Sequence, residues 1–136
     1  MRTIICGSRH FGAGPFSEKD YDLMKSVLAN LRWKPTEVVC GMAKGADTLG
    51  ESWAKANNIP VAYFPANWAK FGRAAGPKRN KEMADYAEAC VAFLFEDSRG
   101  TANMIKLATK KGIPVCVVYC DKNADVKYYP EIFEEE

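Results

Sequence analysis

Glycine, serine and arginine gather in four stretches that each follow a short apolar run. These stretches are CGSRHFGAGP at 6–15, GMAKGAD at 41–47, PANWAKFGRAAGPKRN at 65–80 and EDSRGT at 96–101. Glycine lets a backbone approach a ligand closely, and arginine forms paired hydrogen bonds to phosphate oxygens. The free N–H groups at a helix start also favour anions. This combination predicts a site for a small ligand that carries phosphate.

The candidate site draws on all four stretches. We predict that the ligand-binding residues are Gly7, Ser8, Arg9, Phe11, Gly41, Lys44, Gly45, Ala46, Asp47, Trp68, Gly76, Arg79, Asn80, Ser98, Arg99, Gly100 and Thr101. Structural alternatives exist, because loop glycines serve turn geometry, Asp47 can cap a helix and Trp68 can anchor its loop by packing. The single histidine, His10, has no obvious catalytic partner, which favours a structural or loosely ligand-facing role.

The elements that must position these residues alternate along the chain. Strands are expected at 3–6, 37–40, 61–64, 90–95 and 115–119, and helices at 17–32, 47–57, 77–89 and 101–111, with a loop at 65–76. Strands that are apolar throughout are typical of a parallel sheet buried on both faces. We therefore expect an α/β fold, namely one Rossmann-like domain with a five-stranded, mainly parallel sheet and helices on both faces.

The expected strand order is 3-2-1-4-5, because crossover connections are right-handed. Ligands of such sheets bind beyond the carboxyl ends of the strands, where the strand order reverses. This point lies between the first and fourth strands. All four glycine-containing stretches follow strands and so belong to this edge. Residues 1–120 are expected to form the ligand-binding domain, and 121–136 a peripheral polar tail.

Length and charge exclude several classes of protein. The 136 residues suffice for one domain, and the net charge of +2 argues against a nucleic-acid coat protein. Four of the seventeen acids lie in the last six residues, so the rest of the chain holds nineteen basic residues against thirteen acidic ones. No apolar run approaches the roughly 20 residues of a membrane span, and no secretory signal is expected.

The five cysteines are an odd number and include no Cys-x-x-Cys pair. A disulfide framework or a zinc site is therefore not expected, and we predict no metal and no cofactor. Free cysteines in apolar runs are typical of a reducing, cytoplasmic location.

Four motifs carry a family resemblance. GSRHF at 7–11, GMAKGAD at 41–47, WAKFGRAAGPKRN at 68–80 and SRGT at 98–101 resemble the YspA/YpsA-related branch of the SLOG superfamily, over roughly residues 1–120. That superfamily includes the Lonely Guy phosphoribohydrolases and the DNA-processing protein DprA. The resemblance implies a Rossmann-like fold that binds nucleotides or nucleotide-derived molecules such as ADP-ribose-like species, often as a homo-oligomer.

The leading interpretation is a sensor or sequestering protein for a nucleotide-derived small ligand. Phosphate would lie against 7–9, Gly45 and 100–101, with Arg79 and Arg99 balancing its charge. Asp47 would accept hydrogen bonds from ribose hydroxyls, and Trp68 or Phe11 would cover the base.

Two alternatives stay open. The first is an N-glycosidic hydrolase of nucleoside monophosphates, in which Asp47 is the candidate catalytic residue and Glu51 or Asp97 could substitute for it. Against this, Met104 stands where Lonely Guy enzymes have a catalytic Glu. The second is DprA-like binding of single-stranded DNA, suggested by Gly-Ser-Arg and Gly-x-Ala-x-Gly followed by an acid. The small net charge argues against a nucleic-acid partner.

Overall fold

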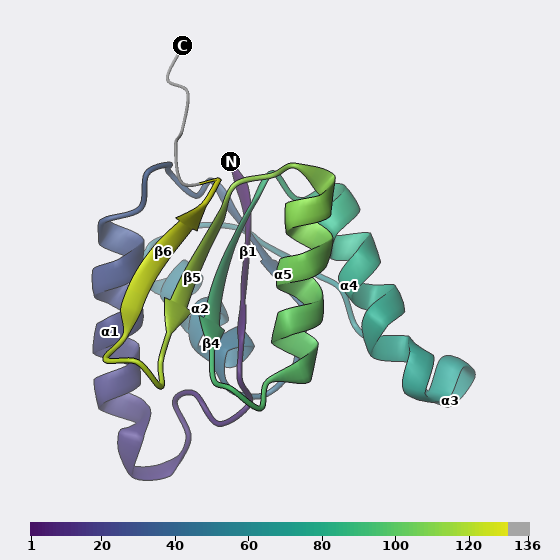
Figure 1. The fold of residues 1–136 in the computed structure, drawn as a ribbon, viewed down its shortest axis with the longest axis horizontal. Helices are drawn as coiled ribbons and strands as arrows, with labels where there is room; N and C mark the ends of the chain where they lie inside the picture. Colours follow the sequence, from purple (N-terminus) through teal and green to yellow (C-terminus); the bar gives the residue numbers. More distant parts are fainter. Residues whose placement is uncertain (131–136) are drawn as a thin grey trace.

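A computed structural model describes residues 1–130 of the chain as one sheet with helices on both faces (Figure 1). In chain order, the elements are β1 (Arg2–Gly7), the 3-10 turn η1 (Gly14–Phe16), α1 (Ser17–Ala29), β2 (Glu37–Cys40), α2 (Ala46–Ala56), β3 (Val61–Tyr63), α3 (Trp68–Phe71), the 3-10 turn η2 (Gly72–Ala74), α4 (Ala75–Tyr86), β4 (Ala89–Leu94), α5 (Arg99–Lys111), β5 (Val115–Tyr119) and β6 (Asp125–Tyr129). Within this part of the chain, no helix is both long and apolar enough to cross a membrane.

The six strands are ordered β3-β2-β1-β4-β5-β6. The first five are parallel and confirm the predicted order. Ile4 of β1 pairs with Val39 of β2 on one side and with Cys90 of β4 on the other. The strand order therefore reverses between β1 and β4, as predicted, and the loops after these two strands flank that point.

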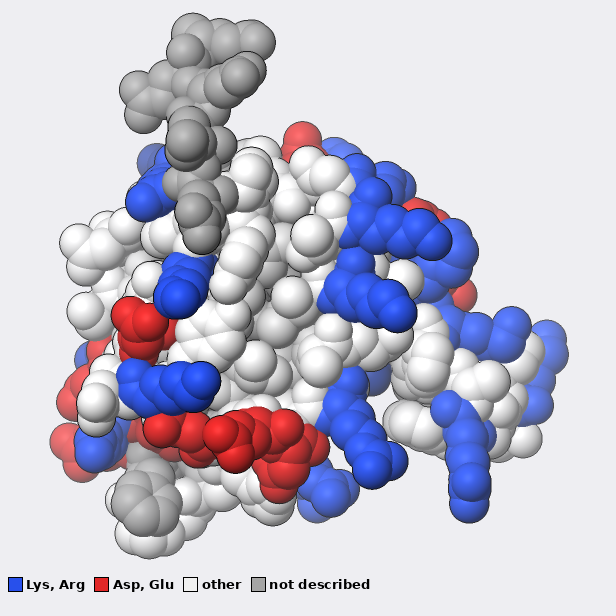
Figure 2. Space-filling view, viewed as in Figure 1, with Lys and Arg blue, Asp and Glu red and all other residues white. Residues whose placement is uncertain are grey.

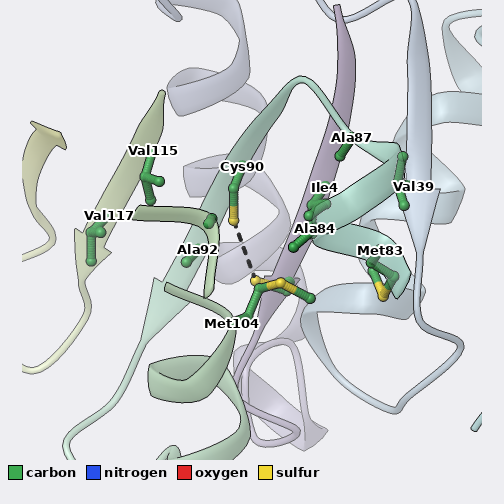
Figure 3. Close-up of a cluster of buried hydrophobic side chains, with 12 residues drawn as sticks. Ile4, Val39, Met83, Ala84, Ala87, Cys90, Ala92, Met104, Val115 and Val117 are labelled. Atoms are coloured by element: carbon green, nitrogen blue, oxygen red, sulfur yellow. Dashed lines mark hydrogen bonds between the residues drawn. The ribbon is translucent and has the colours of Figure 1, made fainter. Parts of the chain in front are cut away.

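Two apolar layers hold the helices to the sheet. Successive strand residues point to opposite faces, so Ile5 packs under α1 and α2 while Ile4 packs under α4 and α5. Figure 3 shows the second layer, in which side chains of β4 and β5 meet Met83 of α4 and Met104 of α5. Both methionines are almost fully buried, so they fix the two helices that border the candidate site.

The predicted count of five strands is one too low. The sixth strand, β6, runs antiparallel along the outer edge of β5. It lies within 121–136, which were expected to be a peripheral polar tail. Its residues are largely exposed, so no apolar run marked it in the sequence. Tyr128 attaches it through an edge-on ring contact with Trp33, 6.0 Å between centroids.

The predicted loop at 65–76 is also wrong over most of its length. It contains α3, a 3-10 turn and the start of α4. The Asn67 side chain caps α3 by accepting a hydrogen bond from the Lys70 N–H (3.0 Å). Pro77 is the third residue of α4, where a helical N–H has no partner within the helix, so proline is tolerated.

Candidate functional site

A cavity of about 440 Å³ opens at the carboxyl edge of β1 and β4. Its size is within the usual range for small-molecule sites. Eleven of the predicted site residues line it: Gly7, Ser8, Arg9, Asp47, Trp68, Arg79, Asn80, Ser98, Arg99, Gly100 and Thr101. The structure thus brings residues from all four glycine-containing stretches to one cavity. That convergence follows from the parallel sheet, because every strand ends at the same edge.

Arg79 and Asn80 of α4 join three walls of the cavity. The Arg79 Nη1 donates to the Gly41 carbonyl oxygen after β2, and its Nε donates to the Asn80 side-chain oxygen (3.0 Å). Asn80 is 8% exposed, and its Nδ2 donates to the Gly100 carbonyl oxygen (3.2 Å) and to Asn103 (2.9 Å). The guanidinium of Arg79 is therefore held in place, and its remaining N–H donors stay available to a ligand.

Asp47 lies at the start of α2 and is 6% exposed. Its Oδ2 accepts a hydrogen bond from the Ala43 N–H (3.1 Å), which fastens the loop between β2 and α2. Burial raises the pKa of this carboxyl to about 6, although Ala43 and Arg79 act in the opposite direction. Asp47 therefore has a structural role in the loop, and it also presents a carboxylate to the cavity.

The start of α5 forms another wall of the cavity. The first N–H to bond within this helix belongs to Ala102, which donates to the Ser98 carbonyl oxygen (3.0 Å). The N–H groups of Gly100 and Thr101 precede it, in the first turn, where helices attract anions. The buried hydroxyl oxygen of Ser8, on the facing loop, accepts from the His10 N–H (3.1 Å). Its hydroxyl proton stays free to donate to a ligand.

The floor of the cavity is apolar. Cys6, Met83 and Met104 all line it and are at most 7% exposed. The Cys6 Sγ is 3.9 Å from the Cys90 Sγ, drawn as the dashed line in Figure 3. This contact and burial raise the pKa of the Cys6 thiol well above its usual value, so Cys6 acts as a small apolar side chain.

Trp68, at the start of α3, also lines the cavity. It is 59% exposed, and its ring packs over Gly76, where an added Cβ would lie 3.3 Å from the indole. The exposed ring is therefore accessible to a ligand, and Gly76 supports it from below without lining the cavity. Trp68 thus packs on Gly76 and also lines the cavity.

The prediction that Phe11 could cover the base of the ligand is wrong. It is fully buried and stacks on Phe93, 4.6 Å between ring centroids, so it cannot cover a base. The aromatic residue at this position serves the core under α1 and α2.

Four further predicted residues support the cavity from behind or lie outside it. Gly41 and Gly45 belong to the loop between β2 and α2. Ala46 is fully buried, and the side chain of Lys44 is exposed. Gly45 has φ +85°, and an added Cβ would lie 2.3 Å from the Ser8 carbonyl oxygen. Only glycine allows the loops after β1 and β2 to come this close.

Six lining residues stand outside the predicted binding set: Cys6, His10, Ala43, Met83, Asp97 and Met104. Of these, the sequence suggests a structural or loosely ligand-facing role for His10 and an alternative catalytic role for Asp97. Cys6, Met83 and Met104 carry no polar signal, but helical spacing places Met104 three residues after Thr101, on the same face of α5. His10 and Asp97 lie at the mouth and are exposed. Over residues 1–130 there is no group of three or more His, Cys, Asp or Glu side chains that could hold a metal ion.

Comparison with known proteins agrees with this architecture. A family model described as the YspA, cpYpsA-related SLOG family matches residues 1–71. The Gene 61 protein of Mycobacterium phage D29 is 38% identical over 123 residues, which cover 84% of this chain and 93% of that protein. The X-ray structure of DNA processing protein A (DprA) from Streptococcus pneumoniae is similar in fold, with a TM-score of 0.64 at 17% identity.

That fold similarity covers 85% of this chain and 49% of DprA, so the chain spans about half the length of that protein. The family match carries more weight, because its 71 residues are more than half of the chain and include the loops after β1 and β2 that wall the cavity. The chain therefore belongs to the YspA, cpYpsA-related SLOG family.

Proposed function

We propose that this protein binds a nucleotide-derived, phosphorylated small ligand in the cavity between β1, β4 and the start of α5. The observation that carries the proposal is the convergence of Arg9, Arg79 and Arg99 with the first turn of α5 around one cavity. Phosphate is the common biological group that such a set of forked cations and free N–H donors recognises.

The rest of the cavity suits the other parts of a nucleotide. Asp47 offers a carboxylate to ribose hydroxyls, and Trp68 offers an exposed ring to a base. Family membership supports ADP-ribose-like molecules or nucleoside phosphates as the ligand. A sensor or a sequestering protein needs no reaction at the site, so binding alone would suffice.

Two further proposals concern the oligomeric state and the cellular location of the protein. A homo-oligomer agrees with the family resemblance. A cytoplasmic location suits the free cysteines, four of which are buried.

Arg99→Ala tests the proposal. Arg99 is exposed at the mouth, so its loss should leave the fold intact while it weakens binding of ADP-ribose or AMP by about tenfold or more, the usual effect of losing a charge-assisted hydrogen bond. Isothermal titration calorimetry measures this. Lys19→Ala on α1, which is also exposed and does not line the cavity, is the matched control. Unchanged affinity in Arg99→Ala for every phosphorylated ligand would contradict the site.

A second candidate function is N-glycosidic hydrolysis of nucleotides. The specific observation is Asp47, a cavity-lining carboxyl whose pKa of about 6 suits a general acid near neutral pH. Incubation with AMP, NAD and ADP-ribose would release free base, and Asp47→Asn would abolish that release. Thermal stabilisation by the same ligands without any base release would support binding alone; a ligand at 100 times its Kd adds about 2.7 kcal/mol.

A further inference from the structure

Asn103 of α5 lies behind the cavity and is bonded to the residue that follows Arg79. It is half-buried and does not line the cavity. Its Oδ1 accepts a hydrogen bond from the Asn80 Nδ2 of α4 (2.9 Å). No motif in the sequence marked this residue. The two asparagine side chains therefore form a polar bridge between the two helices that border the candidate site.

The chemistry of its partners fixes the orientation of the Asn80 amide. The Arg79 Nε can only donate, so it faces the Asn80 oxygen (3.0 Å). The Gly100 carbonyl oxygen can only accept, so it faces the Asn80 Nδ2 (3.2 Å). The second acceptor for this Nδ2 is the Asn103 oxygen. Both N–H groups of Asn80 are thus used within the protein, which favours a positioning role for Asn80 over direct contact with a ligand.

Further along α4 and α5, the contact between the two helices is apolar. Met83 and Ala84 of α4 and Met104 and Ala108 of α5 are buried in one layer (Figure 3). Apolar burial is non-directional, whereas a hydrogen bond requires a particular distance and angle. The asparagine bridge is therefore the contact that sets how the start of α5 lies against Arg79.

Positive charge alone does not select a phosphate group. Figure 2 shows Lys and Arg side chains gathered over α4 and α5, and these charges attract anions of any kind. Selection needs a guanidinium whose N–H groups point in fixed directions, because a free arginine loses rotamer freedom when it binds. Arg79 is held at two points, by the Gly41 carbonyl oxygen through Nη1 and by Asn80 through Nε. Asn103 and Gly100 in turn hold the Asn80 amide in the orientation that accepts from Arg79.

We propose that Asn103 is a positioning residue of the phosphate site, which acts through Asn80 on the guanidinium of Arg79. This inference rests on the proposed function, because the phosphate bound in the cavity is the group that Arg79 would receive. Loss of Asn103 frees the guanidinium without removing any group that lines the cavity. Affinity for a phosphorylated ligand therefore depends on a side chain that the ligand does not touch.

The test is a double-mutant cycle on AMP affinity, measured by isothermal titration calorimetry. Arg79→Ala should weaken AMP binding about tenfold or more, and Asn103→Ala about fivefold. Because Asn103 acts through Arg79, adding Asn103→Ala to Arg79→Ala should weaken binding less than about twofold further, whereas independent roles would multiply to about fiftyfold. Thr109→Ala, which is exposed on the same helix and does not line the cavity, is the matched control and should leave AMP affinity unchanged.

A second measurement needs no ligand and reports on the Arg79 side chain itself. The Nε–H signal of Arg79 in nuclear magnetic resonance spectra is assigned by its absence in Arg79→Ala. In Asn103→Ala this proton should exchange with water about fivefold faster or more, and in Thr109→Ala at the wild-type rate. An asparagine that only stabilised the fold would lower the free energy of unfolding and leave this exchange unchanged.

Three results would overturn the inference. If the wild type binds AMP and Asn103→Ala binds it equally well, the inference fails while the proposed function stands. Fully multiplicative effects in the cycle, or an unchanged Nε–H exchange rate, would show that Asn103 does not act through Arg79. If the wild type binds neither AMP nor ADP-ribose, the proposed function fails, and the inference fails with it.

Discussion

Gly45→Ala is expected to lower the free energy of unfolding by about 3 kcal/mol or more. Gly45 has φ +85° and ψ −124°, a conformation that residues with a Cβ rarely adopt. The added methyl would also lie 2.6 Å from the Arg9 Cα and closer still to the Ser8 carbonyl oxygen, so backbone must move. Urea denaturation measures the loss. Ligand binding should fall as well, because the loops after β1 and β2 would separate.

Gly100→Ala is the matched control for this prediction. Gly100 also belongs to the candidate site, but an added Cβ meets nothing within 4 Å, and its φ is not in the left-handed region. In the first turn of α5, alanine should leave stability unchanged or raise it by up to about 1 kcal/mol. A similar loss in both variants would show that the close approach at Gly45 does not determine the stability of this edge.

Asp47→Asn is expected to stabilise the protein at neutral pH by about 3 kcal/mol. Burial raises the pKa of Asp47 from 3.8 to about 6, so the ionised carboxylate is less favourable in the folded chain than in the unfolded one. Asparagine keeps an oxygen that can accept from the Ala43 N–H and carries no charge to bury. The ionised carboxylate of Asp47 is therefore expected to cost stability at neutral pH.

The pH dependence makes this prediction specific. Between about pH 4 and pH 6 the folded protein holds the Asp47 proton more tightly than the unfolded chain, so wild-type stability falls as the pH rises through that interval. Below pH 4 both states are protonated, and the stability difference between Asp47→Asn and the wild type should vanish. Chemical denaturation at pH 3.5, 5 and 7.5 measures it, with exposed Asp22→Asn as the control. A difference independent of pH would mean that Asp47 is not the titrating group.

The fold was largely predictable because buried strands are marked by apolar runs in the sequence. The apolar runs of β1, β2, β4 and β5 mark strands covered on both faces, and their order followed from the handedness of crossovers. β6 has no such apolar run, because an edge strand exposed to solvent does not need one. α3 was not predicted because a helix of four residues is too short to show an apolar period. Its main sequence signal is the capping residue Asn67.

The position of the candidate site could be predicted from the sequence, but the side chains that line it could be predicted only in part. Parallel strands end at one edge, so the loops that follow them had to converge. Which residues face the cavity depends on how their side chains pack. Phe11 stacks on Phe93 and belongs to the hydrophobic core, whereas Met104, whose apolar side chain suggested no chemical role, lines the floor of the cavity.

The central claim is that a phosphorylated, nucleotide-derived ligand occupies the cavity between β1, β4 and α5. Titration of isotope-labelled protein with ADP-ribose or AMP, followed by amide chemical shifts, tests it most directly. The account predicts saturable shifts at Ser8, Arg9, Gly100 and Thr101, with no comparable change in 28–35 or 53–59 at the opposite edge. Shifts confined to those opposite ranges, or none at saturating ligand, would contradict it.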